Sequence, residues 1–135
     1  MRDNRSMPAS MVIPVLAYGD VAEAVRWLGE AFGFSLRLKI GNHRAQLNAG
    51  DGAVVVAAAP EGAPAPAGCS IMVRVAGVDA HYERAKRAGA RVSGPPETFP
   101  YGERQYSAAD FAGHRWTFSE TVADIDPQDW GGELA

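Results

Sequence analysis

The chain has 135 residues, of which 47% are hydrophobic and 21% charged, and its net charge at pH 7 is -3. This length is typical of one domain, and no apolar run approaches the roughly 20 residues that span a bilayer. The 16 acidic and 13 basic residues form no long blocks of one sign, which disfavours nucleic-acid binding. The N-terminus has no apolar signal core and the single cysteine, Cys69, cannot form an internal disulfide, so we expect a reducing cytoplasm.

The first half of the chain predicts one structural module after a flexible N-terminus of residues 1–10. An aspartate, Asp20, follows a glycine at the position where a helix N-cap is expected, and Gly33 provides a left-handed stop. Between the turn residues, segments with alternating or continuous apolar residues predict strands, and a segment with apolar residues at helical spacing predicts a helix. The predicted strand, helix and three further strands are residues 11–18, 21–32, 34–40, 43–48 and 53–59. Residues 11–59 are therefore expected to form a β-α-β-β-β module.

The second half repeats this order after a Pro/Ala/Gly-rich linker of residues 60–68. Asp79 is expected to cap the second helix as Asp20 caps the first, which makes the two halves an internal repeat. The predicted strand, helix and three further strands are residues 70–75, 80–88, 91–93, 104–108 and 114–119. A second module thus covers residues 69–120, and a tail of residues 121–135 holds a short helical turn at 127–130.

The closing hairpin carries the most distinctive local pattern. Asp110 and Gly113 form the turn, since aspartate bonds its own backbone there and glycine accepts a positive φ. In the last strand His114, Trp116 and Phe118 alternate with polar residues, so one face is aromatic and faces the core while the other is polar. Trp130 is expected to fold back over the sheet or to close a dimer.

Three stretches, GDVAEAVRWLGEAFGF, SIMVRVAGVDA and YGERQYSAADFAGHRWTFSE, resemble the vicinal oxygen chelate superfamily. This superfamily includes glyoxalase I, extradiol dioxygenases, fosfomycin-modifying enzymes and bleomycin-resistance proteins. The resemblance covers roughly residues 11–120. It implies an α+β fold of two β-α-β-β-β modules, with curled sheets, outer helices and often a homodimer.

The resemblance also implies four positions for a divalent metal, and these fall on Ile13, Val56, Ser70 and Thr117. Apolar side chains offer no lone pair, and neutral hydroxyls are far weaker ligands than imidazoles or carboxylates. A shift of one residue at each position reaches no better donor. We therefore expect neither a metal nor another cofactor, and no catalytic residue.

Other chemically capable side chains favour structural roles. His43, His81 and His114 lie on different elements and are interpreted as surface or structural histidines, not as one metal site. Cys69 lacks an evident paired base and is expected to be a small buried residue.

Three carboxylates lie near the closing hairpin. Asp110 is explained by its turn, and Glu103 and Glu120 are expected to face solvent at strand ends. A metal-free acid-base enzyme stays open as an alternative on these residues.

Alternation predicts which side chains line the concave face of the sheets. The expected ligand-binding residues are Ile13, Val15, Val54, Val56, Ser70, Met72, Arg74, Arg115, Thr117 and Ser119, with Ala17 and Ala58 beside them. This lining is an apolar bowl with a few polar points, which suits a ligand held by hydrophobic contact and oriented by sparse polar groups. Arg74 or Arg115 can stack on a planar ring or pair with an anion. The alternative is that these residues fill a closed core.

By resemblance to bleomycin-resistance proteins and to relatives that sequester peptide antibiotics such as thiocoraline, we expect a metal-free small-molecule binding protein. It would confer antibiotic resistance by holding a large, partly aromatic natural product in a homodimer cleft. The missing acidic lining favours a neutral or planar aromatic ligand over a strongly cationic one. The alternatives are a glyoxalase-like lyase, isomerase or dioxygenase with displaced metal ligands, and an accessory domain that binds another protein.

Overall fold

The computed structural model describes residues 2–135 and has an α+β architecture, which confirms the predicted fold class. Two sheets contain the strands in the orders β1-β4-β3-β2 and β5-β9-β8-β6, with β7 paired to β8. The first module consists of β1 (Val15–Tyr18), α1 (Val21–Phe32), β2 (Ser35–Ile40), β3 (Arg44–Ala49) and β4 (Gly52–Ala58). The second consists of β5 (Ser70–Arg74), α2 (Val78–Arg87), β6 (Arg91–Val92), β7 (Glu97–Thr98), β8 (Glu103–Ala109) and β9 (Arg115–Thr121).

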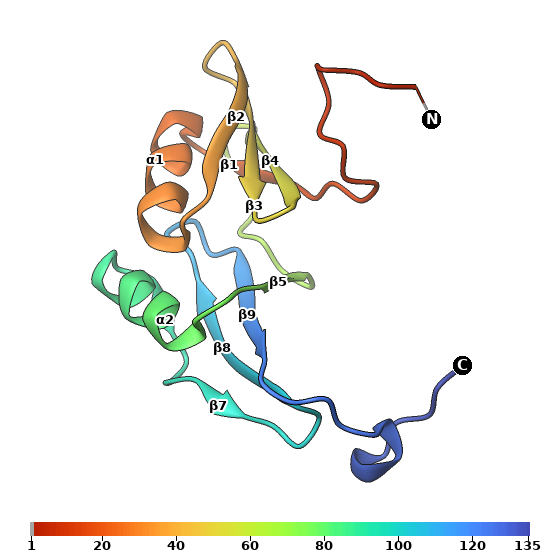
Figure 1. The fold of residues 1–135 in the computed structure, drawn as a ribbon. Helices are drawn as coiled ribbons and strands as arrows, with labels where there is room; N and C mark the ends of the chain where they lie inside the picture. Colours follow the sequence, from red (N-terminus) through yellow and green to blue (C-terminus); the bar gives the residue numbers. More distant parts are fainter. Residues whose placement is uncertain (1) are drawn as a thin grey trace.

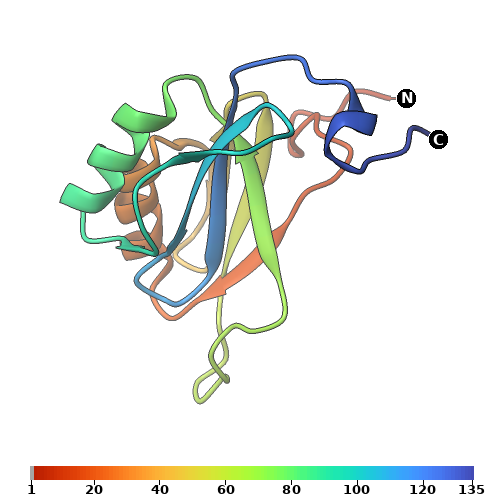
Figure 2. The same ribbon diagram turned by 90° about the horizontal axis from the view of Figure 1, so that it is seen from below.

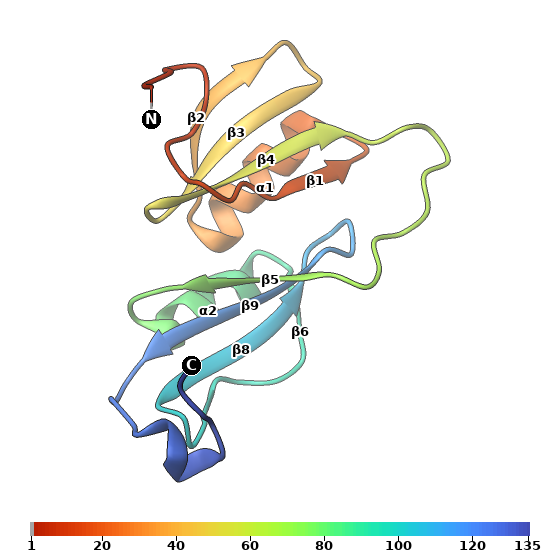
Figure 3. The ribbon, with the colours of Figure 1, turned by 90° about the vertical axis from the view of Figure 1, so that its right-hand side faces the viewer.

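Both helices lie on the same side of the sheets, and both termini lie on the other side (Figures 1 and 2). The sheets are arranged edge to edge, with β1 and β5 as the facing edges (Figure 3). The helices cover one face of each sheet because their apolar stripes must be buried against it. The helices leave the opposite face of each sheet uncovered. None of the helices in residues 2–135 is both long enough and apolar enough to cross a bilayer.

Helix α1 begins and ends as its sequence predicts. The Asp20 side chain accepts a hydrogen bond from the backbone N–H of Glu23 at 3.0 Å, and Gly33 ends the helix with a φ of 78°. Trp27 is buried against Phe32, with the two rings in an edge-to-face contact 5.2 Å apart. Trp27 is therefore part of the hydrophobic core.

Helix α2 begins differently from the prediction. Gly77 is the N-cap residue, with a φ of 71°, and the Glu120 carboxylate accepts a hydrogen bond from the Val78 N–H at 2.9 Å. Asp79 lies inside the first turn, where its carboxylate pairs with Arg104 at 2.9 Å. The prediction that Asp79 caps this helix is wrong, because the left-handed glycine starts the helix too early for Asp79 to reach the free N–H groups.

Strand β1 is shorter than expected. Met11 and Val12 are 86% and 81% exposed, and the strand begins only at Val15. Pro14 contributes its carbonyl, which accepts a hydrogen bond from Val55, but has no N–H to continue the pairing. The prediction that this strand starts at residue 11 is therefore wrong, and β1 is an edge strand with one exposed face.

Asp110 joins the two modules at their shared core. Its buried carboxylate accepts hydrogen bonds from the Tyr18 hydroxyl at 2.6 Å and from the Trp116 indole at 3.1 Å. It also accepts from the backbone N–H groups of Ala112 and His114, as the predicted turn requires. Burial, followed by the charge of Asp110, raises the pKa of the Tyr18 phenol far above its usual value, so this hydroxyl remains a donor.

Two histidines also connect the modules. The His81 ring lies between the Phe32 carbonyl, 3.1 Å from Nε2, and the Tyr106 hydroxyl, 2.5 Å from Nδ1. The Nε2 atom of His114 lies 2.7 Å from the carbonyl of Ala17. Both residues thus have the structural role that we expected.

The two chain ends also make side-chain contacts. The carbonyls of Arg5 and Met7 accept hydrogen bonds from Arg37 of β2 at 3.0 and 2.9 Å, so the N-terminal segment lies against the first sheet. A 3-10 turn at Pro127–Trp130 follows β9, and its tryptophan ring lies 5.2 Å from the ring of Tyr101. Trp130 therefore packs on the loop before β8.

Candidate ligand-binding site

The open face of the second sheet is defined by the aromatic residues on its other side. Trp116 and Phe118 of β9 are buried in the core, so their neighbours Arg115, Thr117 and Ser119 project from the open face. Paired residues of adjacent strands share a face. The registers of β5, β9, β8, β6 and β7 therefore give three rows on this face, which are Ser70-Arg115-Ala109-Arg91, Met72-Thr117-Ser107 and Arg74-Ser119-Gln105-Glu97.

The middle of this face is polar. The hydroxyls of Ser107 and Thr117 are hydrogen-bonded at 2.9 Å, and the Gln105 amide donates to Ser119 at 3.1 Å. The Ser119 hydroxyl in turn donates to Glu103 at 2.6 Å, and this bond is the main cause that lowers the pKa of that carboxyl. The prediction of a largely apolar bowl is therefore wrong for the second module. Sequence reasoning left out the side chains of β8, although the register of the closing hairpin could have indicated them.

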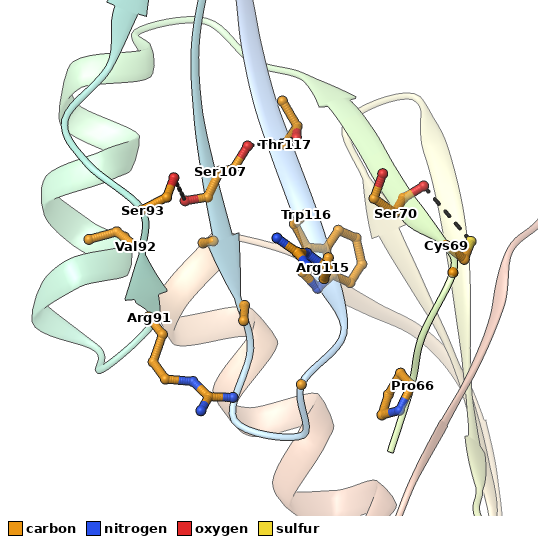
Figure 4. A pocket seen from close by; sticks show the side chains of 14 residues that line it. Pro66, Cys69, Ser70, Arg91, Val92, Ser93, Ser107, Arg115, Trp116 and Thr117 are labelled. Atoms are coloured by element: carbon orange, nitrogen blue, oxygen red, sulfur yellow. Dashed lines mark hydrogen bonds between the residues drawn. The ribbon is translucent and has the colours of Figure 1, made fainter. Parts of the chain in front are cut away.

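A cavity of about 670 Å³ lies at the end of this face nearest the linker. Its wall includes Pro66 and Gly68 of the linker together with polar side chains of β5, β6, β8 and β9 (Figure 4). The hydroxyls and guanidiniums that line it belong to Ser70, Arg91, Ser93, Ser107, Arg115 and Thr117. Of the residues predicted to bind a ligand, Ser70, Arg115 and Thr117 meet in this cavity. Met72, Arg74 and Ser119 lie on the same sheet face beyond its wall.

Cys69 also lines the cavity, and its side chain is exposed. The prediction that this cysteine is buried is wrong, because Cys69 follows the glycine turn at Gly68 and precedes the first residue of β5. It therefore lies between the exposed linker and β5, outside the sheet core. Its thiol is at the wall of the cavity beside Ser70 (Figure 4).

The first sheet does not present its predicted residues together. Val54 and Val56 are only 2% and 0% exposed and belong to the core under α1. Val15, which is 54% exposed, pairs with Val55, so the face of β4 that points away from α1 carries Val55 instead, although Val55 is itself buried. The assignment of Val54 and Val56 to the concave face is therefore wrong by one residue.

Three further residues of the first module were predicted to line the concave face, namely Ile13, Ala17 and Ala58. Ile13 precedes β1 and is half-buried, and Ala58 is the exposed last residue of β4. Ala17 lies on the open face, because its neighbour Tyr18 is buried in the core. The cavity by Ser70 receives no side chain from these three residues.

The metal that the superfamily implies does not fit these residues. Ser70 and Thr117 carry neutral hydroxyls, and the Thr117 hydroxyl is already bonded to Ser107. Val55 replaces Val56 on the open face and is equally unable to bind a metal. Within residues 2–135, no three His, Cys, Asp or Glu side chains are grouped so that they could hold a metal ion.

Comparison with known proteins identifies the family. Residues 11–118 match the family model described as Glyoxalase/Bleomycin resistance protein/Dioxygenase superfamily. The chain belongs to this superfamily. The superfamily assignment confirms the resemblance seen in the sequence, and no curated protein matches the chain.

Solved structures of superfamily members agree with this assignment. TioX from Micromonospora sp. ML1 is 36% identical, and the match covers 84% of this chain and 100% of TioX with a TM-score of 0.69. A glyoxalase/bleomycin resistance protein/dioxygenase from Nocardioides is 19% identical over 93% of this chain and 89% of its own, with a TM-score of 0.66. The lactoylglutathione lyase from Agrobacterium tumefaciens is 19% identical over 84% and 94%, with a TM-score of 0.63. The two matches at 19% identity show a shared fold alone.

Proposed function

We propose that this superfamily member is a metal-free binding protein that captures a partly aromatic natural product of the antibiotic type. The observation that carries the proposal is the cavity of about 670 Å³, whose polar wall consists of hydroxyls and guanidiniums. Side chains of this kind orient a bound molecule by hydrogen bonds, whereas the metal enzymes of the superfamily need imidazoles or carboxylates at the corresponding positions. Capture would protect the producing or exposed cell in its cytoplasm by lowering the free concentration of the compound.

The size and shape of the site support a drug-sized ligand. Ligand pockets typically enclose about 300–1,000 Å³. A larger molecule would extend from the cavity along the same sheet face, over Met72 and Arg74. Met72 is 64% exposed, and its flexible thioether adapts to different ring systems.

The proposal includes a homodimer. Val15 and Met72 are exposed on the open faces beside the β1 and β5 edges, where a second copy would cover them. Covering these apolar side chains would remove an unfavourable exposure and would close the cavity from its open side. Sedimentation of the protein with and without ligand measures the oligomeric state directly.

Titration of the purified chain with a panel of planar aromatic natural products, including peptide antibiotics, tests the proposal. We expect saturable binding by calorimetry, together with a change in tryptophan fluorescence. The variant Ala109→Phe places a bulky ring between β6 and β9 in the cavity wall and should weaken binding at least tenfold. The control Ala80→Phe adds the same ring to the exposed side of α2 and should bind as the native chain does.

Two results would contradict the proposal. Lack of saturable binding across the panel would remove its basis, as would equal binding by the native chain and the Ala109→Phe variant. A stoichiometric divalent metal in untagged protein would instead favour the alternative of a metal-dependent lyase or dioxygenase with displaced ligands.

A further inference from the structure

We infer that the cavity selects ligands that carry an anionic group on a planar aromatic ring, and that Arg91 and Arg115 together hold this group. The inference rests on the proposed function and defines the chemistry of the ligand at the same site. It depends on the register of three strands and on the distribution of charge around them.

Arg91 and Arg115 lie in one row across the sheet. Arg91 of β6 pairs with Ala109 of β8, and Ala109 pairs with Arg115 of β9, so the three side chains share one face. Adjacent strands are about 4.8 Å apart, which places the two arginine backbones roughly 10 Å from each other. Figure 4 shows the Arg91 side chain extending from β6 toward the turn that follows β8.

The residue between the two arginines leaves room for a ligand. Ala109 contributes only a methyl group, and Gly113 in the following turn contributes no side chain to the cavity wall. A planar ring can lie over this small floor while its acidic group lies between two long, flexible guanidinium side chains. Guanidinium groups suit this role because they donate paired hydrogen bonds to carboxylates and also stack on flat rings.

The charges of these two arginines are not balanced within the protein. In the part of the chain that the structure describes, the ion pairs involve Arg26 and Arg104, and neither cavity arginine has a carboxylate within 4.0 Å. Among the described residues that line the cavity there is no aspartate or glutamate. The cavity is therefore a local positive region in a chain with a net charge of -3.

Arg74 provides a contrast on the same sheet face. It lies in the row of Ser119, next to the carboxylate of Glu103, and its charge contributes to the lowered pKa of that carboxyl. The positive charge at that end of the face is thus partly balanced. An anionic group would therefore be held near Arg91 and Arg115, at the linker end of the face.

Neutral donors beside the two arginines would orient the bound group. Ser70 lies next to Arg115 in the same row, and the bonded pair Ser107 and Thr117 forms the adjacent row. One hydroxyl of the pair uses its hydrogen for the mutual bond, so the other can donate to a ligand oxygen. Together these groups match a carboxylate better than a cation, for which the cavity wall offers no charged partner.

Matched aromatic probes test the inference. Calorimetry at low and at physiological salt should show that naphthalene carboxylate binds about tenfold more tightly than naphthalene carboxamide, as expected for charge-assisted hydrogen bonds. The double variant Arg91→Gln/Arg115→Gln should lose this preference. The control Arg87→Gln removes a cation from the exposed side of α2 and should retain it.

The single cysteine reports where the probe binds. Because Cys69 is exposed and lines the cavity, saturating naphthalene carboxylate should slow its alkylation by iodoacetamide severalfold, as measured by mass spectrometry. An unchanged alkylation rate under saturating probe would locate binding elsewhere and overturn the inference. Equal affinity for acid and amide, or a preference that survives in the double variant, would overturn it as well. If the carboxylate does not bind while neutral antibiotics of the panel do, the inference fails and the proposed function stands.

Discussion

A single carboxylate, that of Asp110, contacts groups from both modules. In the sequence its role was limited to the turn before β9, because that turn produces a local pattern of Asp and Gly. The bond to Tyr18 joins residues 92 positions apart, and no local pattern indicates such a contact. Buried polar groups of this kind are costly to leave unpaired, so the residue has a larger role than its turn requires.

Replacement of Tyr18 by phenylalanine tests this role. The substitution removes a hydroxyl donor from buried Asp110, and we expect the free energy of unfolding to fall by about 1–3 kcal/mol in urea denaturation. Tyr101→Phe is the matched control, because the Tyr101 hydroxyl donates to Gln105 at 3.2 Å from a half-buried position. Its effect should be the smaller of the two, and equal stability of Tyr18→Phe and the native chain would contradict the proposed role of this bond.

At the level of the elements, the two helices differ in how they begin. A glycine and an aspartate precede or open both helices, and this repetition predicts identical caps. Asp20 accepts from the N–H of Glu23, the third residue of α1, whereas the N–H of Val78, the first residue of α2, donates to Glu120 of β9. Glu120 is therefore a helix-capping residue and not the solvent-facing carboxylate that we expected.

The pair Asp20→Ala and Asp79→Ala tests the difference between the two caps. Loss of an N-cap side chain costs about 1 kcal/mol, so Asp20→Ala should lower the free energy of unfolding by about that amount. Asp79→Ala removes only an exposed ion pair with Arg104 and should have the smaller effect. Denaturant titration of both variants measures this, and a reversed order would restore Asp79 as the cap.

Sequence patterns predict the elements well but do not always predict their faces. β9 alternates polar and apolar residues, so the face that packs on the core follows from the sequence alone. β2 alternates as well, but a bulge between Leu36 and Leu38 leaves Leu36 50% exposed. β4 is apolar on both sides, with Ala53, Val54, Val55 and Val56 all buried. Only its pairing with β1 decides which of these residues faces α1, and this pairing is a long-range property.

Sequence patterns also predict only some of the residues that line the cavity. Ser70, Arg115 and Thr117 were found because their strands alternate clearly and lie at the module ends. Arg91 was missed, since a strand of two residues carries little periodicity. Its alternation with half-buried Val92, which packs on the core, was the one available indication.

For the molecule as a whole, we expect stability to depend on the protonation of His81, which lies between the two modules. Burial is the main cause that lowers the pKa of His81 below its usual value near 6.5, and the nearby Arg84 lowers it further, while the Phe32 carbonyl partly opposes this shift. The Tyr106 hydroxyl is the other polar group in contact with the ring. Below pH 6.5 the unfolded chain therefore binds a proton more readily than the folded chain, and stability falls as the pH falls.

Thermal unfolding between about pH 7.5 and pH 5.5 tests this dependence. We expect the midpoint temperature of unfolding of the native chain to decrease as the pH falls over this range. The decrease should be smaller in the His81→Gln variant. The exposed His43 provides the control, because His43→Gln should keep the native dependence. An identical slope in all three proteins would show that His81 does not link protonation to module packing.

The linker of residues 60–68 connects the modules and also contributes Pro66 and Gly68 to the cavity wall. Its residues are exposed, and Figure 2 shows the segment projecting away from the sheets. Changes in this segment therefore carry little cost in core packing, yet they alter the rim against which a ligand must fit. Under the proposed function, evolution would change the range of compounds that such a protein accepts by altering the segment that joins its halves, while the sheets that hold the arginines stay the same.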